Sequence, residues 1–212
     1  MSFDPFEDFN TRGYLRNFDG SKDLARVKIN EHIAFQTNLT EALALLKSKT
    51  TINYSDFLQT HKTLFGSLYP WAGEDRSANA PNIAIAKAGR SNMFAHPKAI
   101  RRAADYALQR GQDIEFMRSH PGDVMGLLAH AHPFLDGNGR TIMVLHCDMA
   151  RRAHLGIKWA NVERNAYLAA LTRELESPAK DELDLFLKPY LLFDGDADAY
   201  SLALNSLRLF AK

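Results

Sequence analysis

Apolar residues recur at helical spacing along most of the chain. After Ser21, which we expect to cap the first long helix, leucine, valine, isoleucine and phenylalanine return every three or four positions up to Lys47. Similar patterns predict helices over 55–65, 97–111, 122–130, 138–155, 165–175 and 181–191. The fold is therefore expected to be mainly α-helical.

One short segment has the alternation that is typical of β-structure. Ile83, Ile85 and Lys87 alternate with small residues, and a turn rich in polar residues follows before Phe94. This pattern predicts a β-hairpin between residues 81 and 95, the one β element that the sequence suggests. The expected divisions are an N-terminal extension, one helical domain and a C-terminal helical tail, over residues 1–20, 21–192 and 193–212.

Composition narrows the class of protein. The 46% hydrophobic and 24% charged residues are ordinary for a globular domain, and no apolar run is long enough to predict a membrane span. The net charge of +1 gives no reason to expect nucleic-acid binding. A single cysteine and the absence of a signal-like start favour a cytoplasmic protein, although delivery into another cell stays open.

The segment between two of the predicted helices is dense in polar side chains. Residues 130–141 read His-Ala-His-Pro-Phe-Leu-Asp-Gly-Asn-Gly-Arg-Thr. Gly137 and Gly139 let main-chain N–H groups approach a ligand closely, and the helix that starts here points the positive end of its dipole at that ligand. Such a turn is typical of an anion site.

Side chains around this turn add the groups that phosphoryl chemistry needs. Asp136 supplies a hard oxygen ligand of the kind Mg²⁺ prefers, and Arg140 can reach a phosphate. His132 can act as a general base, since an unperturbed pKa of roughly 6.5 leaves much of it neutral near pH 7. Pro133 stiffens the loop, and Phe134 is expected to anchor it by burying its ring.

Two other interpretations of this segment stay open. A run rich in Asp, Gly and Asn also serves simply to turn the chain. His130 and His132 together with Asp136 also match the ligand types of a transition-metal hydrolase, although a glycine-rich phosphate turn is superfluous at a zinc site. The combination of base, metal ligand and phosphate cradle favours phosphoryl chemistry over both.

Residues 132–140, His-Pro-Phe-Leu-Asp-Gly-Asn-Gly-Arg, resemble the signature of the Fic family, H-x-F-x-[DE]-G-N-G-R-x-x-R. Supporting similarity covers residues 64–76 and 83–94, so that residues 25–190 in all resemble a Fic core. The resemblance implies an all-α domain with a short β-hairpin flap beside the active site.

The resemblance also implies an activity, that of a protein adenylyltransferase. The enzyme would transfer AMP from ATP to a Ser, Thr or Tyr hydroxyl of a target protein, with His132 as the base and Mg²⁺ held on Asp136. The phosphates would be bound by Gly137, Asn138, Gly139 and Arg140. The flap, which pairs with target backbone as an added strand, would use Ile85, Lys87 and Phe94.

The chain departs from the signature at its second arginine, where Met143 stands. That arginine usually contacts the γ-phosphate, so its loss leaves the donor open. The enzyme could use ATP with another cation in its place, a donor without a γ-phosphate such as CDP-choline, or another nucleotide; it could also be a catalytically weak Fic-fold binding module. The candidate replacement cations are Lys87, Arg90 and Arg151.

Self-inhibition in the family often uses a helix with the pattern S/T-x-x-x-E-G/N. Residues 37–41 and 172–176 match only its first five positions. Because Met143 also removes the usual arginine partner of the inhibitory glutamate, we expect no intramolecular inhibition. A separate antitoxin protein stays open as a partner.

Overall fold

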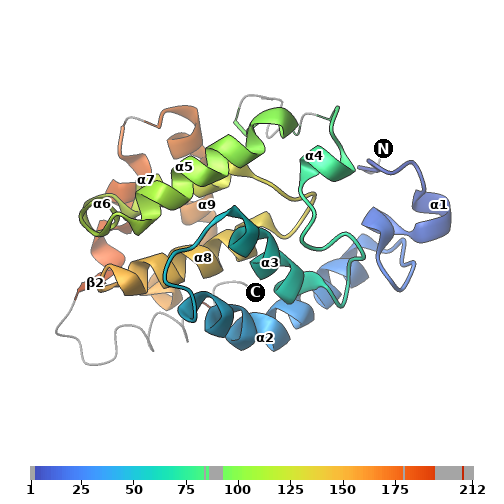
Figure 1. Ribbon diagram of the computed structural model, residues 1–212, viewed down its shortest axis with the longest axis horizontal. Coiled ribbons are helices and arrows are strands. Elements are labelled where there is room, and N and C mark those ends of the chain that lie inside the picture. Colours follow the sequence, from blue (N-terminus) through green and yellow to red (C-terminus); the bar gives the residue numbers. More distant parts are fainter. Residues whose placement is uncertain (1–2, 84, 86–92, 179, 194–206, 208–212) are drawn as a thin grey trace.

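The computed structural model describes residues 3–83, 85, 93–178, 180–193 and 207. Regular structure in these ranges is almost entirely helical, which confirms the expected fold class (Figure 1). The helices are α1 (Phe9–Arg12), α2 (Leu24–Lys47), α3 (Tyr54–Phe65), α4 (Arg76–Asn79), α5 (Ile100–Gln112), α6 (Ile114–Ser119), α7 (Pro121–Ala131), α8 (Asn138–Arg152), α9 (Arg164–Glu176) and α10 (Glu182–Leu187). Short 3-10 helices are η1 (Tyr14–Arg16), η2 (Pro97–Ala99), η3 (Trp159–Asn161) and η4 (Lys188–Tyr190).

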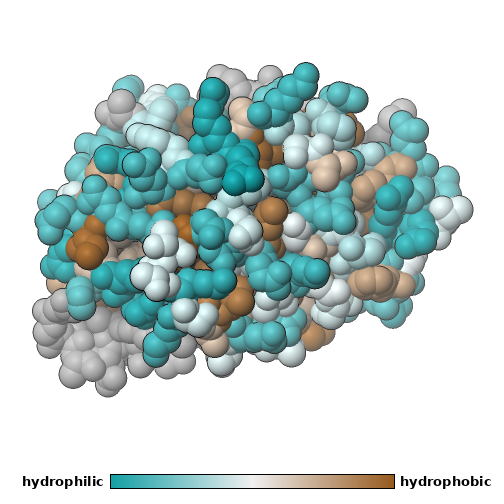
Figure 2. Space-filling model, viewed as in Figure 1, coloured by the Kyte–Doolittle hydropathy of each residue, from teal (hydrophilic) through white to brown (hydrophobic). Residues whose placement is uncertain are grey.

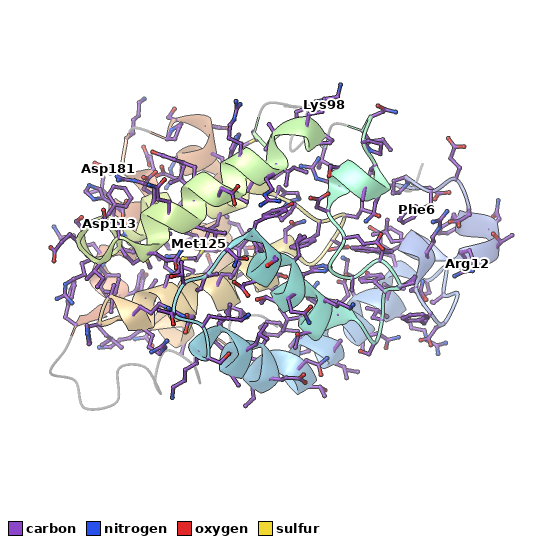
Figure 3. The ribbon with its side chains drawn as sticks, viewed as in Figure 1. Phe6, Arg12, Lys98, Asp113, Met125 and Asp181 are labelled. Atoms are coloured by element: carbon purple, nitrogen blue, oxygen red, sulfur yellow. The ribbon has the colours of Figure 1, made fainter. Side chains whose placement is uncertain are left out.

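Helices α7 and α8 form the centre of the packing. Helix α5 packs along α7, α2 packs along α3, both α2 and α3 contact α8, and α10 lies against α7 and α9 (Figure 1). Met125 of α7 is fully buried and lies in the middle of the molecule (Figure 3). The loop between α7 and α8 is therefore held at both ends by the best-packed helices, which makes it a rigid support for a site.

Polar side chains cap the starts of several helices, α2 and α3 among them. Helix α2 begins at Leu24 rather than directly after Ser21, because the Asp23 carboxylate accepts the N–H groups of Ala25 and Arg26. Helix α3 begins at Tyr54 behind a capping box that Asn53 and Asp56 form. In both cases a side chain accepts main-chain donors that the first helical turn leaves unpaired.

Helix α5 runs one residue past Gly111, which we expected to close it. Gly111 is buried, and a Cβ atom added there would lie 2.4 Å from the Met149 Sδ and 3.0 Å from a Val124 methyl. This glycine therefore permits close packing of α5 on α7 and α8, and it does not end the helix.

The structure contains a strand pair that the sequence analysis missed. Helix α8 ends at Arg152 instead of Leu155, because His154 takes a left-handed backbone with φ of 55°. Helix α10 likewise ends at Leu187 instead of Leu191. Leu155 and Leu191 instead begin the strands β1 (Leu155–Ile157) and β2 (Leu191–Phe193), which pair antiparallel. The expectation of a single β element was therefore wrong, since strands of three residues are too short to show an alternating pattern.

The predicted hairpin between residues 81 and 95 falls largely on residues 84 and 86–92, which lie outside the described residues. The surface in view is mostly polar, with apolar side chains scattered across it (Figure 2). None of the described helices combines the length and the apolar character needed to cross a bilayer.

Candidate active site

His132 lies directly after α7, in a left-handed conformation with φ of 40°. Such a backbone is uncommon for a residue with a side chain and needs support from its surroundings. The fully buried Arg76 provides it: its Nε donates to the His132 carbonyl at 2.8 Å, and its own main-chain N–H donates to the Pro133 carbonyl at 2.7 Å. The His132 ring stacks on Phe94 with 3.9 Å between ring centroids.

Asn138 closes the loop by binding the main chain of Phe134 twice. Its Oδ1 accepts the Phe134 N–H at 2.9 Å, and its Nδ2 donates to the Phe134 carbonyl at 2.7 Å. The Phe134 ring is fully buried, where it stacks on His61 with 3.8 Å between centroids. The Asn138 carboxamide is thus used to hold the loop.

The two glycine positions of the turn have different structural surroundings. Gly137 has φ of 76°, and a Cβ atom added there would lie 2.7 Å from the Phe65 ring. A Cβ atom added at Gly139 would meet no atom within 4 Å. Gly139 is in the first turn of the 15-residue helix α8, where main-chain N–H groups have no partner within the helix. Open space beside such unpaired donors is compatible with an incoming phosphate.

His61 lies beneath the turn and is fully buried. Its Nδ1 accepts the Gly73 N–H at 3.0 Å, so its Nε2 carries the proton and donates to the Asp136 carbonyl at 3.1 Å. Burial lowers the pKa of His61 to about 3, which keeps the ring neutral. His61 therefore fixes the position of the Asp136 main chain and takes no part in proton transfer.

Four charged side chains form a connected network at the mouth of the turn. Asp136 pairs with Lys28, and the Lys28 Nζ also lies 3.0 Å from the Glu31 Oε2. The same Glu31 oxygen accepts the Arg140 Nη2 at 2.8 Å, and its other oxygen accepts the Tyr69 hydroxyl at 2.6 Å. Burial and the nearby Glu31 carboxylate raise the pKa of Tyr69, so it remains a donor. Glu31 is fully buried, and paired partners on both oxygens make this burial tolerable.

These groups line a pocket of about 540 Å³. Its walls come from α2, from the loop and first turns of α8, and from α9. It is lined by Lys28, Glu31, His32, His132, Leu135, Asp136, Gly137, Asn138, Gly139, Arg140, Met143, Arg164, Tyr167, Leu168 and Leu171. The pocket thus joins a histidine, a carboxylate, a helix N-terminus and several cations.

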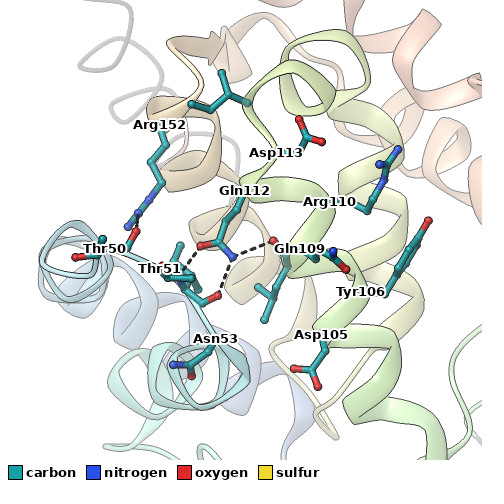
Figure 4. A pocket seen from close by; sticks show the side chains of 13 residues that line it. Thr50, Thr51, Asn53, Asp105, Tyr106, Gln109, Arg110, Gln112, Asp113 and Arg152 are labelled. Carbon is teal, nitrogen blue, oxygen red and sulfur yellow. Dashed lines mark hydrogen bonds between the residues drawn. The ribbon is translucent and has the colours of Figure 1, made fainter.

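A larger cavity of about 870 Å³ lies elsewhere, between residues 50–53, the end of α5 and Arg152 (Figure 4). Its structure is set by Gln112, whose carboxamide binds both the N–H and the carbonyl of Ile52. No histidine and no helix N-terminal glycine turn line it. Size alone therefore does not identify the site. The histidine, the carboxylates and the helix N-terminus described above line the smaller pocket.

The residues expected in the flap are placed as follows. Phe94 lies on the His132 ring, as described above, and Ile85 is half-buried. Lys87 lies outside the described residues.

The alternative interpretation of a transition-metal site finds no support in the geometry. His130 Nδ1 bonds to the Met93 carbonyl at 3.0 Å, while His132 stacks on Phe94. Within the described part of the chain, no group of three or more His, Cys, Asp or Glu side chains is arranged to hold a metal ion. The Asp136 carboxylate beside an anion cradle suits Mg²⁺, which is often bound by one or two carboxylates together with water and substrate phosphates.

The candidate replacements for the missing second arginine are also constrained. Arg151 binds Asp148 with both Nε and Nη2, at 3.0 and 2.8 Å, near the opposite end of α8. It therefore does not reach the pocket. The other two candidates, Lys87 and Arg90, lie outside the described residues.

Sequence analysis missed Glu31, His61, Lys28 and Arg76. For two of them a signal was present. Glu31 stands four residues after Val27 and four before Phe35, and His61 stands four after Phe57 and four before Phe65. A polar residue within the apolar stripe of a helix is costly to bury, so it points to a specific partner.

The chain is similar in sequence to known proteins. The model of the Fic/DOC family matches residues 51–150. The chain is 31% identical over 166 residues to the protein adenylyltransferase VbhT of Bartonella schoenbuchensis, covering 77% of this chain and 34% of VbhT. The chain thus spans about a third of the length of that relative.

Solved structures show a related fold. The N-terminal Fic domain of a VirB-translocated Bep effector from Bartonella quintana, with bound ADP, has a TM-score of 0.70 at 18% identity, covering 88% of this chain and 94% of that one. BepC from Bartonella tribocorum, with bound AMPPNP, has a TM-score of 0.67 at 18% identity, covering 89% and 99%.

Proposed function

Because this chain belongs to the Fic/DOC family, we propose that it is a protein adenylyltransferase that moves AMP from ATP to a Ser, Thr or Tyr hydroxyl of a target protein. The relative VbhT carries that activity in its name, and the two Bartonella structures hold the adenine nucleotides ADP and AMPPNP. The chain spans only part of VbhT, so the proposal depends mainly on its own site.

The observation that carries the proposal is that one pocket brings together His132, Asp136 and the first turn of α8. Phosphoryl transfer needs a positioned nucleophile and stabilisation of charge on the phosphate more than it needs covalent help from the protein. These three features supply a base, a metal ligand and an anion cradle.

In the proposed reaction His132 removes the proton from the target hydroxyl. The hydroxyl oxygen then forms a bond to the α-phosphorus of ATP while the bond from that phosphorus to the bridging oxygen of the β-phosphate breaks. The products are a phosphodiester on the target and pyrophosphate. The strained backbone of His132, held by Arg76, fixes the ring at the pocket wall for this role.

The phosphates are proposed to bind at the start of α8. The Gly137 N–H donates to the Asp136 Oδ1 at 2.8 Å, so the oxygens are attracted mainly by the main-chain N–H groups of Asn138 and Gly139 and by the positive end of the helix dipole. The Arg140 guanidinium offsets charge at the same end. Mg²⁺ held by Asp136 would neutralise phosphate charge and orient the oxygens. The lack of a side chain at Gly139, where a Cβ atom would face open space, leaves room for a phosphate beside these donors.

The target protein is proposed to dock through the flap segment, with Ile85, Lys87 and Phe94 beside the acceptor hydroxyl. The stacking of Phe94 on His132 supports this proposal, because a target held at Phe94 would bring its hydroxyl close to the base. A separate antitoxin remains a further proposed partner.

A second candidate function is transfer from a donor without a γ-phosphate, such as phosphocholine transfer from CDP-choline. It is favoured by Met143, which lines the pocket where the signature has an arginine. A thioether offers a terminal phosphate no charge.

The test is incubation of the purified protein with Mg²⁺, cell lysate, and either α-labelled or γ-labelled ATP. We expect protein label from the α-position alone. His132→Ala should reduce it by roughly 100- to 10,000-fold, because a general base is lost. His154→Asn, which alters an exposed histidine away from the pocket, is the matched control and should keep the label. Label from neither position would contradict ATP as donor, and CDP-choline would be tested next.

A further inference from the structure

The described pocket contains few cations that could bind a terminal phosphate in place of the arginine that Met143 replaces. Apart from its two histidines, the described lining has Lys28, Arg140 and Arg164. Arg140 already has a proposed role at the start of α8, so it is not the replacement for the missing arginine; its Nη2 binds Glu31 at 2.8 Å and its guanidinium lies 4.9 Å from the centre of the Phe65 ring. Lys28 and Arg164 are therefore the two candidates for binding the terminal phosphate.

Lys28 forms an ion pair with Asp136, the proposed metal ligand. Its Nζ bridges Asp136 and Glu31, and its side chain is 43% exposed, so it is held by two carboxylates at the open mouth of the pocket. A lysine head group is a compact charge on a flexible stem, which allows it to change partners without moving the helix.

A divalent cation and Lys28 compete for the same carboxylate. Both carry positive charge and both use Asp136, so a metal ion that binds there repels and displaces the lysine. The network of Lys28, Arg140, Asp136 and Glu31 has two formal charges of each sign and is balanced without ligand. A triphosphate carries more negative charge than one divalent cation offsets, and the surplus lies on the terminal phosphate. The displaced lysine lines the same pocket and can pair with that charge.

We propose that Lys28 is a nucleotide-specificity residue: it pairs with Asp136 in the nucleotide-free site and moves onto the terminal phosphate of the bound triphosphate, replacing the arginine absent at position 143. This inference rests on the proposed function. It predicts that a site with Met143 selects ATP over shorter nucleotides.

The test is calorimetric binding of ATP, ADP and AMP with Mg²⁺, in the His132→Ala background so that no turnover occurs. Lys28→Met should weaken ATP by about ten-fold, the size expected for one lost charge-assisted contact, and leave AMP nearly unchanged. Lys47→Met removes an exposed lysine at the far end of the same helix and is the matched control. Adding Met143→Arg to Lys28→Met should restore the preference for ATP.

A second readout needs no nucleotide. Without its competitor, Asp136 should bind Mn²⁺ more tightly in Lys28→Met than in Lys47→Met, measured by the electron paramagnetic resonance of the free ion.

Other results would overturn the inference. If Lys28→Met weakened the binding of ATP, ADP and AMP equally, Lys28 would have only a structural role. If Lys28→Met bound ATP more tightly, Lys28 would only compete with the metal for Asp136. Loss of ATP preference in Arg164→Met instead of Lys28→Met would assign the role to Arg164. If the parent protein bound none of the three nucleotides, the proposed function itself would fail, and this inference with it.

Discussion

Asn138 shows how one side chain can fix the catalytic loop. Both polar groups of its carboxamide bind the main chain of Phe134, and the side chain is buried in doing so. Two buried main-chain groups would lose their partners if this carboxamide were removed. The cost of an unpaired buried polar group is larger than the gain from forming an average hydrogen bond.

We therefore predict that Asn138→Ala lowers the free energy of unfolding by about 2 to 4 kcal/mol, and with it the activity. Asn165→Ala, at an exposed position in α9, is the control and should change it by no more than about 0.5 kcal/mol. Urea unfolding of the two variants measures the difference. Equal stability would show that the loop does not depend on this side chain.

At this scale the sequence identified the residues that are contiguous, from His132 to Arg140, because their spacing matches a known chemical arrangement. It did not identify Lys28 and Glu31, which come from a helix more than 100 positions earlier. Their ion pairs depend on how α2 packs against α8, and no local pattern encodes that contact.

At the scale of elements, the turn before α8 contains two glycines with opposite constraints. Gly137 has a backbone and a neighbour, Phe65, that exclude a side chain, whereas Gly139 faces open space. The first glycine serves the fold of the turn and the second serves the ligand. These two roles can be distinguished by substituting each glycine separately.

Gly137→Ala should lower the free energy of unfolding by about 1 to 3 kcal/mol, because alanine is strained at φ of 76° and meets the Phe65 ring. Gly139→Ala should leave the fold intact or stabilise it by up to about 1 kcal/mol, since alanine is the better helix former. It should still weaken nucleotide binding, because the methyl group enters the space of the phosphate. Thermal unfolding and nucleotide titration on the same two proteins check this. Unchanged nucleotide affinity in Gly139→Ala would contradict the proposed position of the phosphates.

Long helices such as α2, α3 and α8 could be predicted from sequence because their apolar residues recur over several turns. Their ends could not be placed as well. Gly111 looked like a helix end but is a packing residue, and the strands β1 and β2 are stabilised by pairing with each other across a long stretch of sequence. These features depend on tertiary contacts.

At the scale of the whole molecule, two buried histidines link stability to pH. Burial lowers the pKa of His61 to about 3 and that of His146 to about 4, from an ordinary value of 6.5. Between these values the unfolded chain binds protons that the folded protein does not. The stability from keeping both rings neutral is thus fully present above pH 6.5 and is lost as pH falls toward the folded values.

We predict that the free energy of unfolding falls on acidification from pH 6.5 to 4.5, with each histidine contributing up to about 1.4 kcal/mol per pH unit. His146→Gln should reduce the dependence of the unfolding free energy on pH by the contribution of the one proton that His146 binds on unfolding. This holds whatever the substitution does to stability at neutral pH. Asn165→Ala, which removes no titratable group from an exposed site, should leave the slope unchanged. Urea unfolding at a series of pH values gives the slopes, and an unaltered slope in His146→Gln would show that this ring does not titrate as described.

The central claim concerns the identity of the group that is transferred. The most direct measurement is peptide mass spectrometry of the protein labelled in lysate with ATP and Mg²⁺, comparing the parent protein with His132→Ala. The account predicts a serine, threonine or tyrosine carrying one AMP group in the first sample and unmodified in the second. A hydroxyl carrying phosphate alone or phosphocholine, or an AMP group that persists in His132→Ala, would contradict it.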